Sequence, residues 1–157
     1  MNLRTLPLIL IGLASVLTPF AAGADTPGRH PAYLHARSDL RAAQFLLRVQ
    51  EEEGGVRRRL AEADHEVEAA IGEIDRAALI DRNDLQDHPP VDRNLDRRGR
   101  FARIVELLRS ARADLGREED NGRARGWRDA AYRHIDQALE HMHRTAIDLH
   151  WERELRF

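Results

Sequence analysis

Apolar residues recur at alternating intervals of three and four along four separate stretches of this sequence. Because an α-helix completes a turn in about 3.6 residues, this spacing places each set on one side of a helix. The chain therefore has to bury four narrow apolar stripes, and almost no strand pattern competes with them. The first stripe, within residues 31–53, consists of Tyr33, Ala36, Leu40, Ala43 and Leu47.

Three further stretches, residues 56–82, 100–119 and 123–153, repeat the pattern. Gly54-Gly55 and Asp120-Asn121-Gly122 separate consecutive stretches and are typical helix stops. We therefore predict an all-α protein whose helices form an antiparallel four-helix bundle. The three stripes are Leu60, Ala63, Val67, Ala70, Ile74 and Ala77; Phe101, Ile104, Leu108, Ala111 and Leu115; and Trp127, Ala131, Ile135, Ala138, Met142, Thr145 and Leu149.

The connection between the second and third predicted helices, residues 83–99, is long and contains Pro89-Pro90. An extended chain of this length reaches roughly 55 Å. It can therefore turn back locally or cross the full length of the bundle, as in ferritin-like topologies. The local turn is the simpler connection, so we expect the up-down-up-down order and keep the crossing as the alternative.

The N-terminal residues predict export. Arg4 precedes an apolar run from Leu6 to Leu17, and Ala22-Gly23-Ala24 has the small-x-small pattern of a processing site. The run is shorter than the roughly 20 apolar residues that cross a bilayer. We expect residues 1–24 to be a signal peptide cleaved near Ala24-Asp25.

The remaining residues, 25–157, are enough for a single domain with one core. No other segment is apolar enough to span a membrane. We therefore expect a periplasmic or secreted four-helix domain with no membrane span after cleavage.

Composition excludes several kinds of chemistry. The chain has no cysteine, which excludes disulfides, thiolate zinc sites, c-type haem attachment and thiol catalysis. All 25 basic residues are arginine, 27 residues are acidic and the net charge is −2, so we expect no nucleic-acid partner. No phosphate loop, nucleophile elbow or His-Glu-x-x-His helix occurs, and we do not expect an enzyme.

Histidine is the one residue in informative excess, with eight in the chain. In the up-down-up-down order, the start of the first helix, the connection 83–99 and the end of the fourth helix meet at one end of the bundle. That end would collect imidazoles, which suit Cu, Zn or Ni ions or the iron of a b-type haem. The candidate ligands are His30, His35, His88, His143 and His150.

Periodicity divides the histidines of the fourth helix into two sets. His134, His141 and Asp148 form a stripe on one flank of its apolar face, whereas His143 and His150 lie on the other flank. These side chains cannot converge on one ion from a single helix. Each set therefore needs partners from a neighbouring helix.

Two Glu-x-x-His spacings, Glu62 to His65 and Glu140 to His143, match those of di-iron carboxylate bundles. The apolar registers turn these four side chains away from the core, whereas a di-iron centre needs them inside. The overall plan also resembles that of the b-type four-helix cytochromes. The methionine ligand that this family takes from its first helix is missing here, so His35 with His143 or His150 would have to bind the haem.

Several short phrases of the sequence are recognisable: His30-Pro31-Ala32-Tyr33-Leu34-His35-Ala36, Ser38-Asp39-Leu40-Arg41, Asp87-His88-Pro89-Pro90-Val91-Asp92 and Glu118-Glu119-Asp120. They resemble those of an uncharacterised family of small exported bacterial helical proteins. This resemblance extends over most of the chain after the signal peptide. It implies export and a helical fold, and the family has no assigned activity.

The sequence therefore predicts an exported structural or interaction protein whose partner is another envelope protein or a second copy of the chain. The alternative is a periplasmic protein that binds a transition metal or b-type haem at a histidine-rich end of the bundle.

Overall fold

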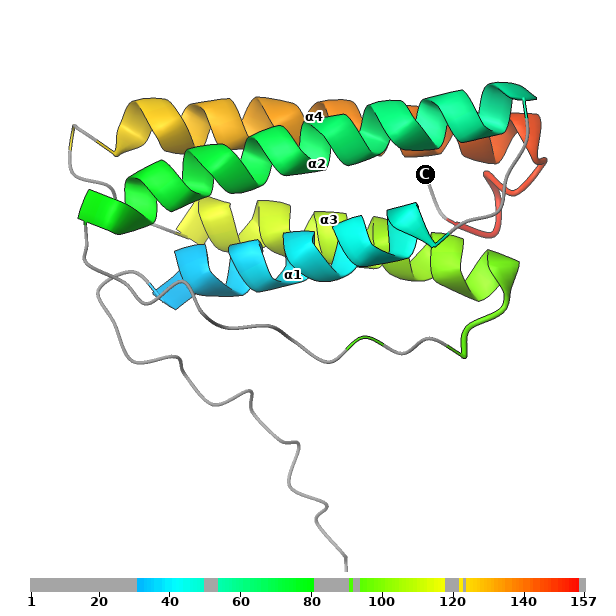
Figure 1. Cartoon of the computed structure of the whole chain (residues 1–157), viewed down its shortest axis with the longest axis horizontal. Coiled ribbons are helices and arrows are strands. Elements are labelled where there is room, and N and C mark those ends of the chain that lie inside the picture. Colours follow the sequence, from blue (N-terminus) through cyan, green and yellow to red (C-terminus); the bar gives the residue numbers. More distant parts are fainter. Residues whose placement is uncertain are drawn as a thin grey trace, which may run out of the picture.

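Four helices make up the described part of this protein. They are α1 (Pro31–Arg48), α2 (Gly54–Ile80), α3 (Arg97–Arg117) and α4 (Arg125–Asp148), and the described residues include no strand (Figure 1). None of these helices combines the length and the apolar character that a membrane span requires. The predicted all-α four-helix bundle is confirmed. The computed structural model describes residues 31–49, 54–80, 91, 94–117, 122 and 124–155.

Local backbone geometry moves some helix boundaries from their predicted positions. The helix α2 begins at Gly54, whose φ of 58° lies in the left-handed region that glycine adopts without strain. The helix α3 begins at Arg97 because the carboxylate of Asp96 accepts a hydrogen bond of 2.8 Å from the Gly99 N–H, as an N-terminal cap does. The Gly54-Gly55 pair therefore opens a helix rather than only ending one.

Contacts between neighbouring helices fix the direction of each helix. Between α1 and α2 and between α2 and α4, residue numbers rise on one helix while those of their partners fall on the other, which is the antiparallel arrangement. The same holds between α3 and α4, where Arg112 meets Asp136 and Gly116 lies against Tyr132. The pairs are Arg37–Asp75 (2.5 Å) and Arg48–Asp64 (3.0 Å) between α1 and α2, Glu62–His141 (3.3 Å) and Glu66–His134 (2.7 Å) between α2 and α4, and Arg112–Asp136 (2.5 Å) between α3 and α4.

The four helices follow an up-down-down-up order, which corrects the expected up-down-up-down order. Since α2 and α3 are both antiparallel to α4, they run in the same direction (Figure 1). The connection between Ile80 and Arg97 therefore bridges the length of the bundle, which is the ferritin-like alternative. The reason is that α3 packs beside α1 and α4, diagonally opposite α2. Because neighbouring helices are antiparallel, helices on a diagonal run in the same direction. A connection of this length can reach either end of the bundle.

The predicted apolar stripes line the interior. Their residues are buried except Trp127 and Leu149, which are half-buried. Among the described residues, the buried polar side chains are those of Arg37 and Thr145. The Thr145 hydroxyl donates to the His141 carbonyl oxygen at 2.8 Å. The four helices thus share one core that holds no imidazole or carboxylate of the described residues.

The helix α1 is the most enclosed of the four. Every described side chain from residue 32 to residue 47 is buried or half-buried. Leu34, Ala42 and Leu46 are buried in addition to the predicted stripe. Val91, in the connection between α2 and α3, packs against the same core. The connection therefore adds an apolar side chain to the core.

Candidate functional site

The structure describes three of the five histidines that the sequence singled out. His30 and His88 lie outside the described residues. His35 is half-buried in the first half of α1, His143 is half-buried near the end of α4, and His150 is exposed just beyond that end. Their separation depends on the directions of α1 and α4.

The up-down-down-up order places the start of α1 and the end of α4 at opposite ends of the bundle (Figure 1). Arg59, near the start of α2, pairs with Asp148 at the end of α4, and α2 starts at the end of the bundle where α1 finishes. With a rise of about 1.5 Å per residue, roughly 20 Å of helix lies between His35 and the end of α1. His35 therefore cannot share an ion or a haem iron with His143 or His150.

Metal ligands do not gather elsewhere in the described part of the chain. No three of its histidine, aspartate and glutamate side chains are arranged so that they could hold a metal ion. In the two Glu-x-x-His pairs, Glu62, His65 and Glu140 are exposed and His143 is half-buried. Their outward direction agrees with the apolar registers and not with a di-iron centre.

Two histidines outside the candidate set join α2 to α4. Nδ1 of His134 lies 2.7 Å from a carboxylate oxygen of Glu66, and Nδ1 of His141 lies 3.3 Å from one of Glu62. Periodicity placed both imidazoles on one stripe of α4, but it could not show which helix faces that stripe. Each imidazole has a carboxylate partner, so these two histidine–glutamate pairs help to fix the position of α2 against α4.

Neither a four-helix fold nor histidine–glutamate pairs between helices are specific to one class of protein. No family model, curated protein or solved structure matches this chain. The resemblance to small exported bacterial proteins therefore stays a prediction from the sequence phrases.

A half-buried carboxylate lies between α1 and α3. Burial raises the pKa of Asp39 above its ordinary value of 3.8, and the neighbouring charge of Asp114 raises it further. A hydrogen bond with Ser110 and the nearby Arg103 and His35 lower it, but the net shift is upward. The folded protein therefore disfavours the ionised form of this side chain.

Replacing Asp39 with asparagine should stabilise the bundle near neutral pH. The folded state holds the Asp39 proton more tightly than the unfolded state, so stability falls as the pH rises from 3.8 through the raised pKa. The advantage of Asp39→Asn should disappear when the pH is lowered below 3.8. Urea denaturation of both proteins across this range measures the difference. If Asp39→Asn were less stable near neutral pH, attraction to Arg103 would outweigh the cost of burial.

A histidine in a left-handed conformation closes α4. His150 has a φ of 58°. Its N–H donates to the Ile147 carbonyl at 3.0 Å, and the Trp151 N–H donates to the Ala146 carbonyl at 2.8 Å. This pair of hydrogen bonds is a Schellman motif, whose left-handed position is usually glycine. The backbone of His150 thus has a structural role at the turn that precedes Trp151.

Replacing His150 with glycine should raise the free energy of unfolding by about 0.5–1 kcal/mol, because glycine adopts this conformation without a steric penalty. The same exchange inside α4, His143→Gly, is the control and should lower it by about 1 kcal/mol. Urea denaturation followed by circular dichroism measures both. A loss of stability in His150→Gly would show that the imidazole makes a contact worth more than the strain.

The residues after α4 fold back onto α3 (Figure 1). The rings of Trp151 and Phe101 meet edge to face, with centroids 5.7 Å apart and planes at 81°. The guanidinium groups of Arg97 and Arg98 lie 5.3 and 5.2 Å from the Trp151 ring centroid, within the range of cation–π attraction. Leu155 is buried. We call residues 151–155 the return segment.

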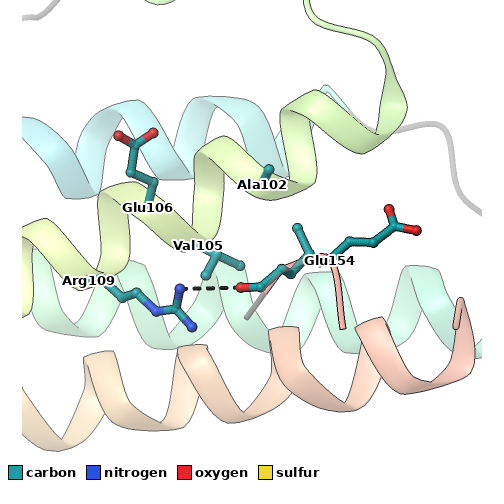
Figure 2. A pocket seen from close by; sticks show the side chains of 6 residues that line it. Ala102, Val105, Glu106, Arg109 and Glu154 are labelled. Atoms are coloured by element: carbon teal, nitrogen blue, oxygen red, sulfur yellow. Dashed lines mark hydrogen bonds between the residues drawn. The ribbon is translucent and has the colours of Figure 1, made fainter. Parts of the chain in front are cut away.

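Beside the return segment, the surface of α3 is hollowed (Figure 2). The groove has a volume of about 220 Å³, and the buried side chains of Val105 and Leu155 form its base. Sequence reasoning missed it because none of its residues belongs to a motif, and only the fold of the return segment creates it. Its lining is Ala102, Val105, Glu106, Arg109, Glu154 and Leu155.

Proposed function

We propose that this chain is an exported helical-bundle protein that acts through surface contacts with another envelope protein or with a second copy of itself. The observation that carries this proposal is the composition of the interior. Among the described residues, every buried side chain other than those of Arg37 and Thr145 is apolar. Such a core holds the helices together but offers no buried carboxylate or imidazole to a substrate or cofactor. The surface is therefore where this protein can act.

Export is supported by the pattern of residues 1–24, which lie outside the described part of the chain. All four described helices follow the proposed cleavage position, so they do not include the signal peptide. The protein recovered from the periplasm or the medium should begin at Asp25 in N-terminal sequencing. Recovery only as a cytosolic form that retains Met1 would overturn the export proposal.

Contact through the surface can be tested by photo-crosslinking in cells. A photoreactive amino acid would replace exposed residues on different faces, and adducts should form on at least one face. The adduct mass distinguishes another protein from a second copy. An absence of adducts at every position, together with a strictly monomeric protein in light scattering, would overturn the proposal. The positions are Ala61, Ala102, Ala113 and Gln137.

A further inference from the structure

Side-chain contacts hold the return segment against α3 in the described part of the chain. Leu155 is buried, and the Trp151 ring meets Phe101 edge to face. Arg98 pairs with Glu154 at 2.7 Å, but these two side chains are 51% and 53% exposed. The N–H groups of Glu154 and Leu155 both donate to the Trp151 carbonyl oxygen at 3.1 Å, so these backbone hydrogen bonds stay within the segment. The segment is therefore a small folded turn that rests on α3.

Packing between the return segment and α3 is incomplete. The groove of about 220 Å³ lies beside Leu155 (Figure 2). The hydrogen bond from the Arg109 guanidinium group to the Leu155 carbonyl oxygen is 3.4 Å long, longer than the roughly 2.7–3.2 Å of most N–H···O bonds. Oε2 of Glu152 is buried without a hydrogen-bond partner among the described residues. Detachment would hydrate this oxygen and would restore conformational freedom to five residues, and both changes favour the detached segment.

The junction between α4 and the return segment has the geometry of a hinge. The φ of 58° at His150 is a left-handed conformation that a residue with a Cβ adopts at a steric cost. The docked segment requires this turn, in which the Trp151 N–H donates to the Ala146 carbonyl oxygen at 2.8 Å. Detachment frees His150 to return to an ordinary φ. Relief of this strain therefore offsets part of the contacts that are lost.

We propose that the return segment is a movable cover of α3, which detaches as a unit about His150 while the four helices stay folded. Detachment uncovers the Phe101 ring and widens the groove over Val105. The segment thus controls when an apolar face near the start of α3 meets solvent. Because the pair Arg98–Glu154 is exposed, salt weakens the docked state. This device is a property of the fold and does not depend on the proposed function.

Native-state hydrogen exchange, followed by NMR on the protein from Asp25 to Phe157, tests the detachment. The N–H groups of Trp151, Glu154 and Leu155 should exchange through one common opening. Their protection factors should be on the order of 10–1000, as for an open state populated at about 0.1–10%. The N–H groups of Ile135 and Met142, on the buried face of α4, should be protected at least about a hundredfold more, because their exchange requires unfolding of the bundle.

A matched pair of variants tests the role of the exposed ion pair. Glu154→Gln removes the partner of Arg98 and should raise the open population at least about twofold at low salt. Glu106→Gln is the control, since Glu106 forms an equally short pair of 2.7 Å with Arg103 that lies entirely within α3. It should change the open population by less than about 1.5-fold. Circular dichroism checks that both variants stay folded.

Salt and the hinge give two further measurements. Raising sodium chloride from about 0.01 M to about 0.5 M should raise the open population of the parent about twofold. Most of this response should be absent in Glu154→Gln. His150→Gly removes the strain of the docked turn and should lower the open population about two- to fivefold.

Several results would overturn this assignment. Equal exchange of the Leu155 and Met142 N–H groups would show that the segment opens only with the whole bundle. Protection that falls gradually from Trp151 to Leu155 would show ordinary fraying of a chain end, and an absence of protection would show that the segment is not docked. Equal effects of the two glutamate variants, or an open population that does not fall in His150→Gly, would also contradict the proposal.

Discussion

Replacing Phe101 with alanine should lower the free energy of unfolding by about 4 kcal/mol, the largest loss that we expect from one substitution in this chain. Phe101 is 1% exposed in the first half of α3 and belongs to the shared core. Its ring also supports the edge of Trp151, with centroids 5.7 Å apart. The alanine would leave a cavity in the core and remove the aromatic partner of the return segment.

Urea denaturation followed by circular dichroism measures this loss. Phe45→Ala is the control, since Phe45 is only half-buried against the same core, and it should cost about half as much. A second measurement uses the fluorescence of Trp151 in a Trp127→Phe background. Emission should shift to longer wavelength in Phe101→Ala, because Trp151 becomes more hydrated. An unchanged spectrum would show that Phe101 does not hold the return segment.

Replacing Asp75 with alanine should lower the free energy of unfolding by about 2–3 kcal/mol, because it removes the carboxylate beside a buried guanidinium group. The side chain of Arg37 is 6% exposed, and its Nε lies 2.5 Å from Oδ1 of Asp75, which is 29% exposed. Breaking such a pair leaves a charge between α1 and α2 that has lost a main partner and is poorly hydrated. The partial exposure of Asp75 moderates the loss.

Two further proteins make the Asp75 prediction specific. Asp64→Ala removes one of two carboxylates that pair with Arg48 between the same two helices, where the arginine side chain is 53% exposed and keeps Glu68 at 3.3 Å. This variant should lower the free energy of unfolding by at most about 0.5 kcal/mol. The double variant Arg37→Met with Asp75→Ala should have a free energy of unfolding within about 1 kcal/mol of the parent, because neither charge of the pair remains. Equal losses in Asp75→Ala and Asp64→Ala would show that the Arg37 pair is not effectively buried.

The apolar stripes show which part of the fold the sequence predicted correctly. Ile104, Ile135 and Met142 were placed in the core from their spacing, and all are buried. Helical periodicity depends only on residues a few positions apart, so it can be read locally. Helix ends were less accurate, because the start of α3 depends on the side-chain cap from Asp96, and the end of α4 on the left-handed backbone of His150.

The histidines show what the sequence could not predict. His134 and His141 were seen as one stripe, but their partners Glu66 and Glu62 lie on α2, and nothing in the spacing along α4 could identify that helix. The predicted gathering of His35 with the histidines at the end of α4 assumed the up-down-up-down order. Once α2 and α3 run in the same direction, the start of α1 and the end of α4 are far apart.

The sequence by itself determined four amphipathic helices and the faces that they bury, because both follow from residue type and from a period of about 3.6 residues. Only the tertiary structure decided which helices are neighbours, which imidazoles meet carboxylates and where α3 is hollowed. A connection long enough to reach either end of the bundle carries no directional information. The direction of α3 was set instead by how it packs against α1 and α4, and the groove by the return of Leu155 to its surface.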